Sequence, residues 1–187
     1  MTASRALREL TAERVLTRVQ GSGTFVAPRH YESTVLEVRN IADEIAARGH
    51  RHSTHVLRLE AFDDAEAIAS LDLAKGPVFH SCIVHAEEGT LIQYEDRYTK
   101  PRLFPDYLQQ DFTRETPNHC TVRLAPIQRA EFRIDAQKPN ATIRRLLEME
   151  IGEPCLLVSR RTWVGDSVAT AVQLWHSSLR FHLVGKM

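Results

Sequence analysis

The stretch HSCIVHAEEGTLIQYEDRYTKP, residues 80–101, decides the fold of this chain. Strand-forming residues dominate 78–86 and 91–99, and the turn residues Glu88 and Gly89 stand between these two segments. Two such runs around a short turn predict a β-hairpin. Because side chains alternate between the faces of a strand, the hairpin would present two chemically different surfaces.

The rest of the chain alternates strands with short helices. Residues 155–164 and 167–175 predict a second hairpin, and alternating apolar side chains predict strands at 57–61, 130–136 and 181–184. Four helices are expected from cap residues and apolar spacing: one carrying Val38, Ile41 and Ile45, one capped by Asp63 or Asp64, one beginning at Thr116-Pro117, and one from Asn140 to Gly152. This pattern predicts an α+β fold on a mainly antiparallel sheet with packed helices.

Composition limits the class of protein. The chain has 187 residues, a formal net charge of +0 and a pI of about 7.1, so its total charge does not argue for nucleic acid. Cys82, Cys120 and Cys155 are few and scattered, which indicates buried thiols in a reducing compartment. There is no apolar run of membrane-spanning length and no signal-peptide pattern, so we expect a cytoplasmic protein without a membrane partner.

The first 28 residues have the pattern of a helix followed by a two-stranded ribbon. A strand is expected over 15–20 and its return over 24–27, with a glycine-rich tip at 21–23. This is the shape of a wing, whose narrow glycine tip, flanked by Arg18 and Gln20, would enter a minor groove of DNA. A surface helix with an ordinary hairpin fits the same pattern equally well. Residues 28–33 show no period and are expected to be a linker.

The second strand of the central hairpin carries charged residues on both faces. Glu95 and Arg97 share one face, while Asp96 and Tyr98 share the other. The face with Glu95 is either a solvated salt-bridge ladder or the wall of a polar pocket.

Trp175 follows a strand that places Ala169, Ala171 and Gln173 on its own face. Small residues beneath a large ring would leave a flat slot in which an imidazole stacks. A tryptophan packed in the core is the alternative.

Metal and catalytic motifs are not expected. His50, His52 and His55 would not share one face, and the chain has no CxxC pair, so we predict no metal site. His80 and His85 would face opposite ways along their strand. The sequence contains no nucleophile elbow and no P-loop, so we assign no catalytic residue, expect no cofactor and predict that the chain is not an enzyme.

Several segments resemble one group of bacterial regulators. RALRELTAERVLTRVQGSGTFVAP, residues 5–28, resembles the recognition helix and wing of the GntR superfamily. Four further segments resemble the UTRA effector domain of the HutC subfamily: the hairpin stretch, PDYLQQDFTRETPN, LAPIQRAEF and RRTWVGDSVATAVQLWHSSLRFHL. Within them, QYEDRY and LWHxxxRF are the parts specific to this subfamily. The resemblance implies a partial winged helix-turn-helix over 1–28, without the two helices that normally precede the recognition helix, and a chorismate-lyase-like UTRA domain over 34–187.

The resemblance also implies a function. It points to a ligand-responsive, homodimeric repressor of histidine utilisation genes that binds operator DNA and takes urocanate, histidine or a related imidazole as effector. DNA contacts are expected from Thr2, Arg5, Arg18, Gln20 and Gly21. Effector contacts are expected from His85, Glu95, Arg97, Thr116, Arg161, Ala169 and Trp175.

Roles for some effector residues follow from their chemistry. Glu95 would accept the imidazole N–H of urocanate, and Arg97 or Arg161 would pair with its carboxylate. The helix after Thr116 offers a further anion site at its N-terminus. Two alternatives remain: an effector-binding module that does not bind DNA, and an enzyme on the related chorismate-lyase-like fold.

Overall fold

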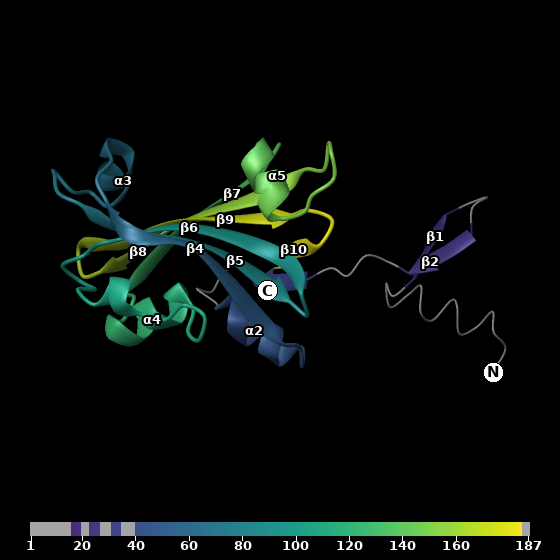
Figure 1. Ribbon diagram of the computed structural model, residues 1–187, viewed down its shortest axis with the longest axis horizontal. Coiled ribbons are helices and arrows are strands. Elements are labelled where there is room, and N and C mark those ends of the chain that lie inside the picture. Colours follow the sequence, from purple (N-terminus) through teal and green to yellow (C-terminus); the bar gives the residue numbers. More distant parts are fainter. Residues whose placement is uncertain (1–15, 20–22, 27–30, 35–39, 185–187) are drawn as a thin grey trace.

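The fold is described from a computed structural model, which covers residues 16–19, 23–26, 31–34 and 40–184 (Figure 1). Its centre is a six-stranded antiparallel sheet in the order β4-β5-β6-β9-β8-β7. The strands are β4 (His52–Phe62), β5 (Val78–Glu87), β6 (Thr90–Thr99), β7 (Arg129–Gln137), β8 (Cys155–Val164) and β9 (Ser167–Ser177). The predicted antiparallel α+β fold and both predicted hairpins are therefore confirmed.

Short helices cover both faces of this sheet. α2 (Ile41–Ala47) and α4 (Pro117–Leu124) lie against one face, and α3 (Ala65–Ser70) and α5 (Ala141–Leu146) lie against the other (Figure 1). We call these the α4 face and the α5 face. The 3-10 helix η1 (Tyr107–Gln109) precedes α4.

Each of these α-helices begins at a side chain that accepts a hydrogen bond from a backbone N–H of the first turn. The N-cap residues are Asn40, Asp64, Thr116 and Asn140. An N-cap satisfies one of the donors that a helix start leaves without an intrahelical partner. Three of the four caps were expected from the sequence.

Two apolar clusters pack on each face of the sheet. On the α4 face, one cluster joins Ile83 and Phe104 to Cys120 of α4, and the other joins Ile41 and Ile45 of α2 to Ile92 and Phe181. On the α5 face there are two separate clusters, one under α3 around Leu71 and Trp163 and one under α5 around Val84 and Leu147. Between these clusters, paired residues form the polar row Asp96, Gln173 and Ser159.

A bulge displaces part of β9. The register between β8 and β9 shifts after Thr162, so Ala169 has no partner directly opposite. Ala169 packs with Ile83 and Phe104 in the cluster of the α4 face. The bulge thus turns Ala169 to the face opposite Ala171, which packs against Trp163.

The prediction of a linker at 28–33 is wrong for residues 31–33, while residues 28–30 lie outside the described residues. The chain forms β3 (Tyr31–Thr34), which pairs in parallel with β10 (Phe181–Val184). A four-residue strand without alternating apolar residues gives no periodic signal, and each of its residues pairs with one far along the chain, as Tyr31 does with Phe181.

The predicted ribbon near the start of the chain is present. β1 (Leu16–Val19) and β2 (Gly23–Val26) pair antiparallel, with Arg18 opposite Thr24. The expected DNA contacts Thr2, Arg5, Gln20 and Gly21 lie outside the described residues, as does Val38. Within the described segments, no helix is both long and apolar enough to span a membrane.

Candidate functional site

Four charged or titratable side chains are buried together on the α4 face. His85 comes from β5, Glu95 and Arg97 from β6, and Arg160 from β8. Arg97, Val172 and Arg160 form one row across β6, β9 and β8. Because neighbouring strands lie about 4.8 Å apart, a small valine side chain separates the two arginines by about 10 Å at the backbone.

Glu95 and Arg97 form an ion pair within this cluster. Arg97 Nε donates to Glu95 Oε1 at 2.6 Å, and the two residues are 2% and 1% exposed. Burial alone would raise the pKa of Glu95, but the charges of Arg97 and His85 outweigh burial and hold this pKa well below its usual range. Glu95 is therefore ionised.

Arg160 was not expected at this site. Its Nη2 donates to Asn118 Oδ1 in the first turn of α4 at 2.9 Å. Burial and the like charge of Arg97 lower the pKa of Arg160 to about 9, although Glu95 partly compensates. Strand alternation would place Arg160 on the same face as Arg97, but only once the order of the strands in the sheet is known.

His85 completes the cluster. Its Nε2 lies 3.5 Å from Glu95 Oε2, and its Nδ1 is hydrogen-bonded to His52 Nε2 at 3.0 Å. The two imidazole rings stack with centroids 5.3 Å apart. Burial, followed by the neighbouring His85, lowers the pKa of His52 to about 4, so His52 is neutral at physiological pH.

The cluster contains more positive charge than its carboxylate balances. Arg97 and Arg160 face the single carboxylate of Glu95, and the buried carboxylate of β5, Glu87, is already held by Arg48. Arg97 Nη2 and Arg160 Nε are buried without a hydrogen-bond partner. Buried donors and cations without partners are costly, so this arrangement is suited to a small anion.

The N-terminus of α4 lies beside this cluster. The side chain of Thr116 accepts from His119 N at 3.1 Å and donates to Asn40 Oδ1 at 2.8 Å, which connects α4 to the start of α2. A cavity of about 180 Å³ is lined here by His52, Phe112 and Thr116. His52 and Asn118 connect this region to the buried cluster, because they hydrogen-bond to His85 and Arg160.

Two of the expected effector residues do not lie with the others. Arg161 lies on the α5 face, where Nη2 pairs with Asp72 Oδ1 at 2.7 Å. Trp175 is opposite Tyr94, on the same α5 face, and packs against the cluster under α5. Strand alternation is the reason, because Arg161 follows Arg160 and Trp175 follows Leu174, whose partner is Glu95.

The remaining expected residues do lie on the α4 face. His85, Glu95 and Arg97 form the buried cluster, Thr116 caps the helix above it, and Ala169 packs in the adjoining core. Five of the seven residues expected at the effector site thus lie on the α4 face, and three of them, His85, Glu95 and Arg97, contact one another.

Comparison with known proteins gives the family. The UTRA domain matches residues 47–182. The "Histidine utilization repressor" of Pseudomonas putida is 50% identical over 188 residues, covering 100% of this chain and 76% of that protein. The C-terminal domain of the histidine utilization repressor from Pseudomonas syringae has a TM-score of 0.70 at 40% identity, covering 73% of this chain and 99% of that domain.

A more distant structure shares the fold. PhnF from Mycobacterium smegmatis has a TM-score of 0.82 at 21% identity, covering 98% of this chain and 83% of that chain. The chain belongs to the UTRA family and, within the GntR superfamily, to the HutC-type histidine utilization repressors.

Proposed function

We propose that this chain acts as a cytoplasmic transcriptional repressor of histidine utilisation genes, and that its effector is urocanate. The observation that carries the effector assignment is the excess positive charge of the buried Glu95–Arg97–Arg160 cluster. The identity with a named histidine utilization repressor supports the regulated genes. The proposal includes no enzymatic step.

Urocanate matches this cluster in chemical type. Its carboxylate would accept hydrogen bonds from Arg97 and Arg160, each of which has a buried N–H group without a partner. Its imidazole offers an N–H to Glu95 and a ring nitrogen to His85. A flat ligand with one anionic end and one hydrogen-bonding end would satisfy both halves of the cluster.

The response to effector would follow from linkage. A ligand that joins β6, β8 and α4 binds tighter to the arrangement in which those elements are close, and so changes the population of that arrangement. We propose that the protein is a homodimer, because operators read by winged helices are commonly two-fold symmetric. The arrangement favoured by urocanate would hold the DNA-contacting segments at a spacing that does not fit the operator.

Isothermal titration calorimetry with urocanate, histidine and a sugar phosphate tests the effector assignment. We expect saturable binding of urocanate, weaker binding of histidine, whose ammonium group would face buried cations, and no heat with the sugar phosphate. Absence of heat with every imidazole ligand would refute the assignment.

DNA binding has its own test. The β1–β2 ribbon supports a wing contact, with Arg18 as a described candidate for a phosphate or groove contact. Gel-shift titration with a histidine utilisation operator would show binding that urocanate reverses and that Arg18→Ala weakens. If the chain binds urocanate but not the operator, it is an effector-binding module rather than a repressor on its own.

A further inference from the structure

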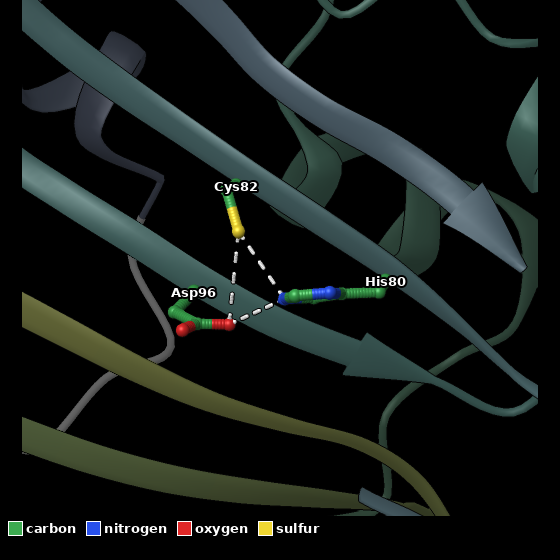
Figure 2. A group of neighbouring side chains, drawn as sticks. All are labelled: His80, Cys82 and Asp96. Atoms are coloured by element: carbon green, nitrogen blue, oxygen red, sulfur yellow. Dashed lines mark hydrogen bonds and ion pairs between the residues drawn. The ribbon is translucent and has the colours of Figure 1, made fainter. Parts of the chain in front are cut away.

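A second group of chemically active side chains lies on the α5 face, away from the effector cluster. His80 and Cys82 project from β5, and Asp96 projects from the neighbouring β6, so that all three converge (Figure 2). His80 Nε2 is 2.8 Å from Asp96 Oδ1 and 3.2 Å from Cys82 Sγ, and Cys82 Sγ is 4.0 Å from Asp96 Oδ1. Spacing within single segments of the sequence predicts no metal site, because these three ligands come from two different strands.

We propose that His80, Cys82 and Asp96 bind a divalent transition metal ion of the zinc type. Imidazole, thiolate and carboxylate are the three ligand classes that zinc takes in proteins. With zinc–ligand bonds of about 2.0 to 2.3 Å at tetrahedral angles, ligand atoms lie about 3.3 to 3.6 Å apart. The three separations in this group scatter around that range, so small side-chain rotations suffice to close it on an ion.

The strands hold two of the three ligands firmly. His80 and Cys82 are 4% and 7% exposed, and the His80 ring packs against both Phe62 and Tyr98, with centroid distances of 5.0 and 4.7 Å. Side chains fixed in this way lose little freedom when an ion binds, which favours a preformed site.

The group has a route to solvent and an open coordination position. Asp96 is partly exposed and, with Tyr98, lines a cavity of about 540 Å³ between α3 and the sheet. An ion held by three side chains would complete its tetrahedron with a water from this cavity. On the neighbouring strand β4, Arg58 stands opposite Cys82 and is paired with Glu60 at 3.4 Å.

Metal binding would displace protons from this group. Cys82 must lose its thiol proton and His80 must present a neutral Nε2, while Asp96 coordinates as the carboxylate. The ion thus replaces the hydrogen bonds that now join the three side chains. Binding is expected at neutral pH and is expected to release protons into the buffer.

Cobalt(II) titration of the full chain under reducing conditions tests the proposal. We expect one cobalt per chain, with the visible bands of a tetrahedral ion and a near-ultraviolet thiolate charge-transfer band, both reversed by zinc. Cys82→Ser is expected to abolish the charge-transfer band. Asp96→Asn and His80→Gln are expected to weaken cobalt affinity by more than about tenfold. Losing a residue that only supports a metal ligand typically costs about 10- to 100-fold in affinity, and losing the ligand itself should cost at least as much.

The matched control is Cys120→Ser, since Cys120 is also buried but lies in α4 on the other face. This variant is expected to keep the full cobalt spectrum. Circular dichroism and urocanate calorimetry on each variant establish that it is folded. A cobalt complex without thiolate charge transfer, or a band that survives Cys82→Ser, would overturn the proposal, because either result places the metal on other residues.

Discussion

Arg160 and Arg161 are consecutive residues of β8, yet their guanidinium groups act on opposite faces of the sheet. Arg160 is buried and donates to Asn118 of α4, whereas Arg161 pairs with Asp72 after α3. Strand alternation imposes this division. The same substitution can therefore be made at two neighbouring arginines, one on the α4 face with the effector cluster and one on the α5 face.

Arg160→Gln is expected to weaken urocanate binding by about 10- to 100-fold. The change removes a charged donor to the ligand carboxylate, and hydrogen bonds to charged groups contribute about 1.5–3 kcal/mol. Arg161→Gln is expected to leave affinity within about twofold. Calorimetry on both variants measures the difference. Equal losses in the two variants would indicate that the carboxylate does not bind on the α4 face.

Glu95→Gln is expected to lower the free energy of unfolding by about 3–5 kcal/mol, because it leaves Arg97 and Arg160 buried without a counter-charge. Urea denaturation at neutral pH measures this. The control is Glu88→Gln, which removes an exposed pair with Arg51 at 3.7 Å and should cost less than about 1 kcal/mol. If the two variants unfold alike, the buried cations must be compensated by other groups.

Thr116→Val is expected to cost about 1–2 kcal/mol of stability and also to weaken urocanate binding. The variant loses the cap of α4 and the hydrogen bond to Asn40. Asn140→Ala removes the corresponding cap of α5, on the opposite face, and should lower stability similarly without changing affinity. Denaturation and calorimetry on both variants separate the two effects, and an unchanged affinity in Thr116→Val would remove α4 from the site.

Local patterns predicted much of the fold. The hairpins around Gly89 and Gly165 were predicted because both turns use a glycine with positive φ, 82° and 58°, between alternating strands. The caps Thr116 and Asn140 were predicted because their hydrogen bonds are made within three residues. Such features depend on near neighbours only, and a single sequence contains them in full.

Non-local features were missed. The membership of Arg160 in the effector cluster depends on the order β6-β9-β8, and the convergence of His80 with Asp96 depends on the register of β5 against β6. The bulge that turns Ala169 toward the α4 face is a one-residue shift that alternation cannot anticipate. Each depends on how distant segments pair, which residue spacing within one segment does not encode.

The pH dependence of stability is expected to reflect His176. This histidine is buried, its ring stacks on Phe181 with centroids 3.7 Å apart, and Nδ1 donates to the carbonyl of Ile92 at 3.2 Å. Burial, which outweighs that hydrogen bond, lowers the pKa of His176 to about 3 from an ordinary value of 6.5.

Between pH 6.5 and 3, the unfolded chain therefore binds a proton at His176 that the folded chain does not. The free energy of unfolding should fall as pH falls through this window, by up to about 1.4 kcal/mol per pH unit from this residue, and its contribution should be complete above pH 6.5.

His176→Gln cannot take up this proton, so its stability should decline less steeply than that of the wild type in urea denaturation between pH 7 and 4. His55→Gln, at an exposed position of β4, should keep the wild-type slope. The contributions of His52 and Glu95 remain in both variants, so the difference in slope isolates His176. Parallel curves for His176→Gln and the wild type would mean that His176 is protonated equally in the folded and unfolded chains.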